Sequence, residues 1–213
     1  MLRTWLKNTD GDGSTARVML FDFRQVFDLV DHNILATKLS TYNIPESIKY
    51  WILDFLSNRK QRVKLGNDCQ SEWSNVHASV PQGTKLGPWL FAIKVDDINV
   101  PGVDDFWRYV DDSTMSESVG KNDLSLIQSH VNVFTEKSIA NGMELKETKC
   151  KELRISFSSS NKFFDSIIIN NKNVEVVTVV KLLGVTLSND LKWNSHIANT
   201  CKKVFLRLCF LRQ

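Results

Sequence analysis

Paired aspartates are the residues of this 213-residue chain whose type and spacing could do chemistry. The tripeptide Val-Asp-Asp occurs three times within eighteen residues, at residues 95–97, 103–105 and 110–112. The first pair ends a helical stretch, and the second follows the turn at Pro101 and Gly102, where solvated or turn-forming aspartates are common. Asp111 and Asp112 differ because they lie between two short apolar strands, which predicts the tip of a tight hairpin.

This hairpin tip is an unfavourable place for two carboxylates. Two-residue hairpin turns favour Asn-Gly or Asp-Gly because the turn needs positive φ, and adjacent like charges also repel each other. Such a local conflict is expected at functional sites. A divalent cation such as Mg²⁺ would remove the repulsion, since it prefers hard carboxylate oxygens. An exposed acidic turn without a ligand is the alternative.

A third carboxylate comes from a separate part of the chain. Asp22 ends the apolar run RVMLFD, which predicts a buried strand whose last residue points toward a site. In a mixed sheet, this strand could lie beside the hairpin of Asp111 and Asp112. Carboxylates from two strands that hold two metal ions about 3.5–4 Å apart are a common arrangement for in-line phosphoryl transfer.

Hydrophobic periodicity predicts the elements that must position these residues. A short helical piece and a turn are expected over residues 1–16. In the longest predicted helix, Leu124, Ile127, Val131 and Phe134 recur at spacings of three and four. Helices are predicted over residues 31–41, 46–57, 84–97, 122–141 and 193–211, and strands over 17–22, 59–66, 72–80, 105–110, 113–118, 152–158, 166–170 and 179–187. This mixture of helices and antiparallel hairpins predicts an α+β domain.

Composition narrows the class of protein. A net charge of +3 permits a nucleic-acid partner without demanding one. The four cysteines and four histidines are scattered, which argues against a zinc site and favours reduced thiols in an intracellular protein. The chain has no apolar run of the roughly 20 residues that a membrane span needs. The amino terminus turns polar after six residues, so no signal peptide is predicted.

Five stretches, in order and at matching spacing, resemble motifs of one family. The stretch LFDFRQVFDLVDHNIL resembles motif A of the reverse transcriptase domain of non-LTR (LINE-type) retrotransposons. VPQGTKLGPWLFAIKVDDI resembles motif B, RYVDDST motif C, NGMELKETKCKEL motif D and KLLGVTLSNDLKW motif E. Each short motif is weak by itself, but the ordered set makes a chance similarity unlikely.

The resemblance implies roles for the residues around the aspartates. Asp22, Asp111 and Asp112 would bind two Mg²⁺ ions, with Mn²⁺ as an alternative, and the backbone carbonyl of Phe23 would help to ligate a metal. Lys149 would act on the pyrophosphate leaving group, as an acid or as a charge. A solvated basic face, shared with neighbouring lysines, is the alternative for Lys149.

The resemblance also implies residues that bind the nucleotide. Phe27 would be a steric gate against the 2′-hydroxyl and would favour dNTPs, although a core phenylalanine is the plainer interpretation. Gln82 would contact the sugar or template with its donor and acceptor groups, and Gly83 would let the backbone approach the substrate. The alternative is an ordinary turn at Pro81-Gln82-Gly83.

Two basic clusters could contact template or primer phosphates independently of sequence. A solvated charged face is the alternative for each cluster. The two clusters consist of Arg59, Lys60, Arg62 and Lys64, and of Lys202, Lys203 and Arg207.

The resemblance implies a reverse transcriptase palm, with an antiparallel sheet packed on helices, the start of a thumb, and fingers that are largely missing. Residues 1–16 would be a remnant of the fingers, residues 17–187 the palm with motifs A to E, and residues 188–213 a helix that begins a thumb or connection. Only 21 residues precede Asp22, so a partner chain that supplies the fingers is an open alternative.

The implied function is RNA-directed DNA polymerase, which transfers a nucleotide from a dNTP to a primer 3′-hydroxyl. The implied partners are an RNA template, a DNA primer and a dNTP, without a membrane, in the nucleus or the cytoplasm. Two alternatives are a non-catalytic remnant that binds an RNA/DNA duplex and a degenerate copy of an element. A metal-dependent nuclease fits less well, because Gln82 and Phe27 suit nucleotide selection.

Overall fold

The computed structural model describes residues 1–10, 14–24, 27–66, 69–76, 78–81, 83–103, 105–158 and 162–211. Within these ranges the chain combines helices with mainly antiparallel strands, as the α+β prediction expects. It divides into two compact units. The first unit comprises Met1–Asp22, Val100–Thr135 and Leu145–Gln213, and the second comprises Phe23–Asn99 and Glu136–Glu144.

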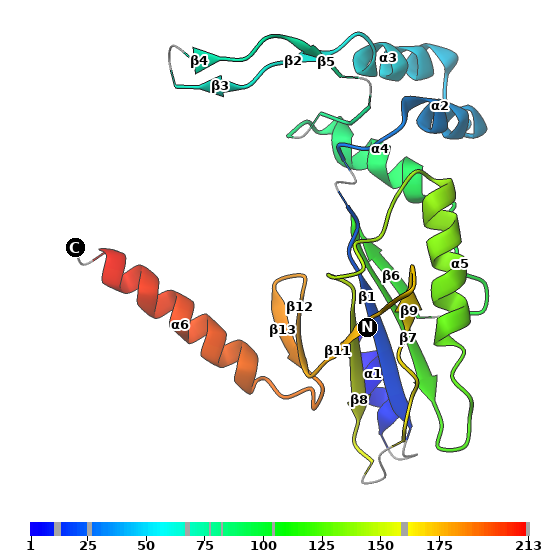
Figure 1. Ribbon diagram of the computed structural model, residues 1–213, viewed down its shortest axis with the longest axis vertical. Coiled ribbons are helices and arrows are strands. Elements are labelled where there is room, and N and C mark those ends of the chain that lie inside the picture. The colour runs from blue at the N-terminus through cyan, green and yellow to red at the C-terminus, as the bar shows by residue number, and fades with distance from the viewer. Residues whose placement is uncertain are drawn as a thin grey trace. The chain divides into compact units, whose positions relative to one another are not determined.

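A five-stranded sheet forms the centre of the first unit (Figure 1). Its strand order is β11-β8-β1-β7-β6, and only the pair β11 and β8 is parallel. Strand β1 lies in the middle and is buried along almost its whole length, so both of its faces must be apolar or paired. The strands are β1 (Thr15–Phe21), β6 (Phe106–Tyr109), β7 (Asp112–Val119), β8 (Lys151–Ser156) and β11 (Glu175–Val177).

Helices cover both faces of this sheet. On one face, α1 (Leu2–Thr9) packs the buried Trp5 in a cluster with Val18, and the indole N–H of Trp5 donates to Ser116 Oγ at 2.9 Å. On the other face lies α5 (Ile127–Ala140), where the ring of Phe134 is 4.3 Å from that of Phe21. Contacts on both faces hold the end of β1 in place, directly before Asp22.

Three helices build the second unit, and their apolar faces share one buried cluster that includes Leu35, Leu56 and Leu90. Asp31 caps the first of these helices, because its carboxylate accepts hydrogen bonds from two backbone N–H groups of the first turn. The helices are α2 (His32–Thr41), α3 (Glu46–Leu56) and α4 (Leu86–Val95).

Residues 59–66 and 69–76 form two exposed, paired segments, which we call the basic arm. In it, β2 (Lys60–Gln61) pairs with β5 (Ser74–Asn75), and β3 (Lys64–Leu65) pairs with β4 (Cys69–Gln70). The predicted pairing of residues 59–66 with residues 72–80 is confirmed at β2 and β5. The pairing of β3 with β4 was not predicted, because residues 69–70 carry no clear strand pattern.

The helix predicted over residues 122–141 begins later, at Ile127. The cause is Glu117 on β7, whose carboxylate accepts hydrogen bonds from the backbone N–H groups of Leu126 and Ile127 and so caps the helix there. Leu124 is 89% exposed, so its place in the apolar spacing was misleading. A cap that comes from a separate strand could not be seen in local periodicity.

The predicted strand over residues 179–187 is instead a hairpin of β12 (Val179–Leu182) and β13 (Val185–Ser188). Leu183 and Gly184 form its turn with φ of 47° and 86°, the left-handed pair that tight hairpins need. A second short hairpin joins β9 (Ile168–Ile169) to β10 (Lys172–Asn173). The second half of this hairpin and β11 were not predicted.

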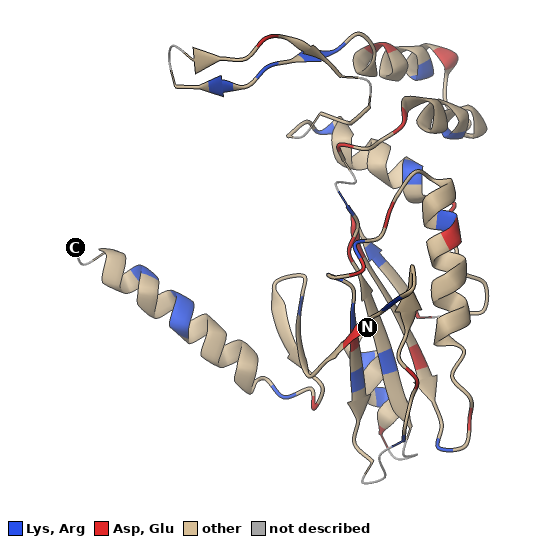
Figure 2. Ribbon diagram, in the orientation of Figure 1, with Lys and Arg blue, Asp and Glu red and all other residues tan. Residues whose placement is uncertain are grey.

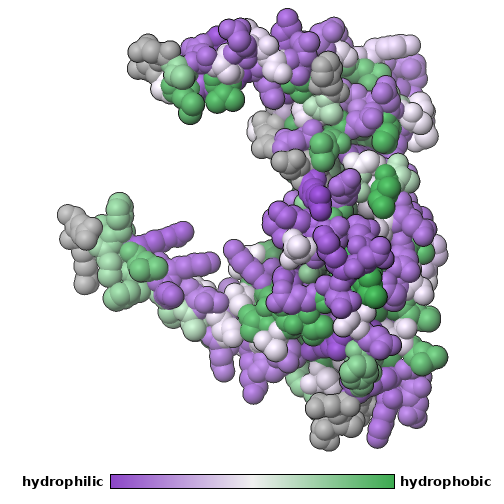
Figure 3. All heavy atoms as spheres, viewed as in Figure 1, coloured by the Kyte–Doolittle hydropathy of each residue, from purple (hydrophilic) through white to green (hydrophobic). Residues whose placement is uncertain are grey.

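The last helix, α6 (Asn194–Leu211), buries none of its side chains. Apolar residues such as Phe205 and Leu211 are 66% and 77% exposed. Figure 3 shows green, hydrophobic atoms gathered along this helix. None of the helices in the described ranges is both long and apolar enough to cross a membrane.

Candidate active site

Asp22 directly follows the last residue of β1. Its backbone carbonyl accepts a hydrogen bond from the N–H of Lys146 at 2.7 Å, and the thiol of Cys150 lies 3.9 Å from the same oxygen. The segment before β8 therefore packs against the end of β1. These contacts leave the Asp22 carboxylate partly exposed, with 38% of its side chain accessible.

The register of the sheet brings Asp22 to the hairpin of β6 and β7. Phe21 is paired with Ser113 in the antiparallel ladder of β1 and β7. One step further in the same register, Asp22 and Asp112 fall opposite each other at the same end of the two strands. Two carboxylates that are 90 residues apart in the sequence thus meet at one edge of the sheet.

The turn of this hairpin differs by one residue from the prediction. Tyr109 pairs with Asp112, so the turn consists of Val110 and Asp111, and Asp112 is the first residue of β7. Val110 has φ of 56°, a left-handed conformation that costs free energy for a β-branched residue. The unfavourable backbone conformation expected at this turn is therefore present, and it occurs at Val110.

The carboxylates of this edge interact electrostatically. Partial burial raises the pKa of Asp112 above its ordinary value, and the negative charges of Asp111 and Asp22 raise it further. Side chains that repel one another in this way offer the hard oxygen ligands that Mg²⁺ or Mn²⁺ takes. Within the described residues, however, no three His, Cys, Asp or Glu side chains are close enough together to form a metal site.

Lys149 belongs to the same edge. Its Nζ atom is 3.6 Å from Oδ1 of Asp22, and both side chains are partly exposed, so the pair adds little stability. It does place one positive charge beside the aspartates.

Sequence reasoning missed Cys150, whose thiol pKa is raised by burial to about 11, which keeps the thiol protonated and unreactive at neutral pH.

The predicted nucleotide-binding residues belong to the second unit. Phe27 is half-buried, and its ring lies 5.0 Å from that of Phe91 on α4. Gly83 has φ of 80°, a conformation that favours glycine, and a Cβ atom there would meet no other atom within 4 Å. Phe23 is also half-buried. Gln82 lies outside the described residues.

The side chains of the two basic clusters are exposed, except that of Arg59, which is half-buried. Figure 2 shows blue segments along the basic arm and along α6. On the basic arm, the guanidinium of Arg62 lies 4.6 Å from the ring centre of Trp73, a cation–π pair that is open to solvent. The side chain of Arg59 is less available to a ligand, because its Nη1 donates a hydrogen bond to the backbone carbonyl of Ser79 at 3.4 Å. On α6, the side chains of Lys202, Lys203 and Arg207 are all exposed.

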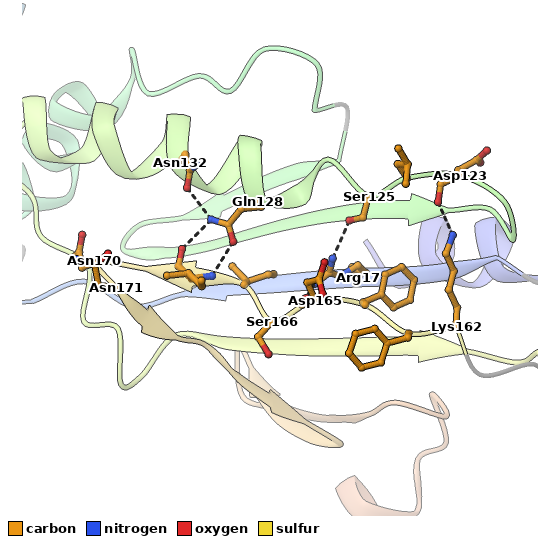
Figure 4. Close-up of a pocket in the computed structure, with 15 residues that line it drawn as sticks. Arg17, Asp123, Ser125, Gln128, Asn132, Lys162, Asp165, Ser166, Asn170 and Asn171 are labelled. Carbon is orange, nitrogen blue, oxygen red and sulfur yellow. Dashed lines mark hydrogen bonds between the residues drawn. The ribbon is translucent and has the colours of Figure 1, made fainter.

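A cavity of about 700 Å³ lies elsewhere on the first unit and contains none of the predicted site residues (Figure 4). Its polar groups largely bond one another. Gln128 exchanges two hydrogen bonds with the backbone of Ile168, and Arg17 donates to Ser125. Lys162 donates to the carbonyl of Asp123. We therefore place the candidate active site not in this cavity but at the end of the sheet that carries Asp22, Asp111 and Asp112, which we call the aspartate edge.

Known proteins similar to this chain agree on one family. The RNA-directed DNA polymerases of the mobile element jockey from Drosophila funebris and Drosophila melanogaster are each 26% identical to it, over 84% of this chain but only 20% of their own length. The Pol polyprotein of the retrotransposable element R2 from Popillia japonica is 26% identical over 48% of this chain and 15% of its own length. The chain thus spans about one fifth of the length of its jockey relatives.

Solved structures share the fold. Telomerase from Candida tropicalis, in complex with a fragment of telomeric RNA, matches with a TM-score of 0.60 at 12% identity, over 91% of this chain and 32% of that protein. Its apo form matches with a TM-score of 0.57 at 13% identity, over 89% and 37%. The family model for reverse transcriptase (RNA-dependent DNA polymerase) matches residues 4–187. The chain therefore belongs to the reverse transcriptase family, and its relatives are polymerases of non-LTR retrotransposons.

Proposed function

We propose that this chain carries the nucleotidyl-transfer site of an RNA-directed DNA polymerase from a non-LTR retrotransposon. The observation that supports this most directly is the aspartate edge. The sheet register sets Asp22 opposite Asp112, and the charges of Asp22 and Asp111 raise the pKa of Asp112. A bound divalent cation would relieve the repulsion among these carboxylates.

The side chains of the described residues do not form a metal cluster as they stand, so Asp22, Asp111 and Asp112, together with the backbone carbonyl of Phe23, would have to draw closer together to hold two Mg²⁺ ions, or Mn²⁺ in their place. When bound, such ions activate the attacking hydroxyl and neutralise the phosphate charge. The primer 3′-hydroxyl would attack the α-phosphorus of the dNTP, and pyrophosphate would leave. Lys149 lies 3.6 Å from Asp22, where its ammonium group would stabilise the leaving pyrophosphate or give it a proton.

Nucleotide selection would rest on residues of the second unit. Phe27 would contact the sugar and disfavour a 2′-hydroxyl, and its packing against Phe91 would keep the ring in place. Gly83, which has positive φ, would allow close approach of the backbone to the substrate. Gln82 would bond the sugar or the template through its amide.

The wider organisation belongs to the same proposal. Residues 1–16 would belong to the fingers, residues 17–187 to the palm, and residues 188–213 to the start of a thumb or connection. The nucleic-acid partners would be an RNA template and a DNA primer, contacted by the two basic clusters, in the nucleus or the cytoplasm.

A second candidate is a chain that holds an RNA/DNA duplex without extending the primer. The exposed basic arm favours it, because Arg62 and Trp73 form a solvent-facing pair that could stack on a base. Helix α6, none of whose side chains is buried, adds three further cations. Neither cluster depends on the aspartates.

Primer extension on an RNA template with dNTPs and Mg²⁺ separates these functions. The variant Asp111→Ala, Asp112→Ala should lose extension and keep duplex binding, whereas the control Asp96→Ala, Asp97→Ala removes the same pair from another Val-Asp-Asp and should retain extension. Duplex binding without extension by the unchanged chain would support the second candidate. Equal extension by both variants would contradict the proposed roles of Asp111 and Asp112.

A further inference from the structure

Lys94 is a lysine with no accessible surface, although lysine is among the residues least often buried. It lies on α4, among the buried Leu90, Phe91 and Val95. Its Nζ atom donates to the backbone carbonyls of Leu29 at 3.3 Å and Gly142 at 3.5 Å. Burial of an ammonium group is costly unless the group is well paired, so its place in the core needs a reason.

Both carbonyls belong to segments that support Phe27. Leu29 lies two residues after Phe27 in the same loop. Gly142 lies in the turn after α5, two residues before Glu144, whose carbonyl accepts a hydrogen bond from the N–H of Arg24 at 2.9 Å. The ammonium group of Lys94 therefore joins the turn that contains Phe27 and Leu29 to the turn after α5, which is itself bonded to Arg24.

Helix α4 makes a second contact with the same loop. Phe91 is three residues before Lys94 and hence on the same helix face, and its ring packs on that of Phe27. On the other side of the loop, the N–H groups of Val80 and Ser79 donate to the carbonyls of Phe27 and Val30 at 2.9 and 3.1 Å. Phe27 is thus held through its ring and through its backbone.

We propose that Lys94 is a positioning residue for Phe27, the proposed steric gate against the 2′-hydroxyl. Lys94 holds the loop of Phe27 against helix α4 and thereby sets the position of the Phe27 ring. This inference rests on the proposed function, since Phe27 selects a sugar only in a working polymerase. Lys94 touches neither substrate nor metal and acts through Phe27.

Lys94→Met tests the proposal, because methionine fills a similar volume without the donor group and should fold. The measured quantity is the ratio of kcat/KM for a dNTP to that for the matching rNTP. The variant should lower this ratio about threefold to tenfold, as expected for loss of buried hydrogen bonds. Lys121→Met, which alters an exposed lysine, should leave the ratio unchanged.

A double-mutant cycle shows whether Lys94 acts through Phe27. Phe27→Ala should lower the selectivity ratio, and adding Lys94→Met to it should lower the ratio no further. Additive effects of the two substitutions would overturn the proposal, as would a ratio that Lys94→Met does not change.

Hydrogen exchange measured by mass spectrometry supplies a readout that needs no activity. Lys94→Met should speed exchange at the amides of Arg24, Ser79 and Val80 and leave those of β1 unchanged. If the unchanged chain extends no primer, the proposed function fails, and exchange alone then decides whether Lys94 holds this loop. Unchanged exchange at all three amides would overturn the proposal in either case.

Discussion

At the scale of single residues, the carboxylate of Asp112 has an electrostatic cost that a cation would remove. Its pKa in the folded chain lies above the ordinary value of 3.8. At neutral pH, where Asp112 is ionised, its charge therefore opposes folding. Without metal, Asp112→Asn should therefore raise the free energy of unfolding, by about 1 kcal/mol or less because the site is partly exposed. Urea denaturation at pH 7 with a chelator measures this change.

The same variant should respond less to metal. Mg²⁺ should raise the Tm of the unchanged chain, because it binds the folded state, and raise that of Asp112→Asn by a smaller amount. Asp54→Asn removes an exposed aspartate on α3, in the second unit, and Mg²⁺ should raise its Tm as much as that of the unchanged chain. An equal Mg²⁺-dependent shift in all three proteins would argue against a metal site at this edge.

Lys94 predicts a pH dependence of stability with a definite sign. Burial and, to a smaller extent, the charge of Lys38 together lower its pKa from 10.5 to about 8, against the opposing effect of Asp31. Between these two values the unfolded chain binds more protons than the folded chain, so stability should rise with pH. Relative to Lys94→Met, the unchanged chain should gain up to about 1.4 kcal/mol per pH unit from pH 8 to pH 9.5. Urea denaturation across this range checks the difference, with Lys192→Met as the exposed control.

At the scale of elements, a buried ion pair joins β1 to β8. Nε of Arg17 lies 2.7 Å from Oε1 of Glu152, whose side chain is fully buried, and Arg154 contacts the same carboxylate at 2.9 Å. Glu152→Ala should lower the free energy of unfolding by about 3–5 kcal/mol, because it leaves buried guanidinium charge without its partner. Urea denaturation measures the loss.

The matched control for this pair is on the neighbouring strand. Glu175 pairs with Lys151 but is 66% exposed, so Glu175→Ala should cost less than about 1 kcal/mol. Similar losses for Glu152→Ala and Glu175→Ala would mean that burial does not set the strength of these contacts.

At the scale of the whole molecule, two basic clusters could bind the nucleic-acid backbone. Replacing Lys60, Arg62 and Lys64 by Gln should flatten the dependence of log binding constant on log salt concentration, by about 0.9 for each duplex phosphate contact removed. Fluorescence anisotropy with an RNA/DNA duplex at several salt concentrations measures this slope. The matched variant replaces Lys202, Lys203 and Arg207, and an unchanged slope in either variant would remove that cluster from the interface.

Local pattern was sufficient for much of the fold. The run before Asp22 is apolar because β1 is covered on both faces. The helix before Pro45 carries its own cap, Asp31, and the helix after it begins directly behind that proline. The start of α5 was wrong because its cap comes from Glu117 on β7, and the hairpin of β12 and β13 was missed because its turn places a leucine at positive φ. In both cases, the deciding interaction or conformation overrides the local pattern.

By itself, the sequence determined the family and the α+β class, because ordered motifs and hydrophobic periodicity are properties of the chain. It also predicted Asp22, Asp111 and Asp112 as the site residues, from the same motifs and from an acidic turn between two strands. Only the tertiary structure decided that Asp22 stands opposite Asp112, that Val110 carries the strain, and that Lys94 is buried beside the loop of Phe27. Strand register and burial come from contacts between residues far apart in sequence, so no local pattern contains them.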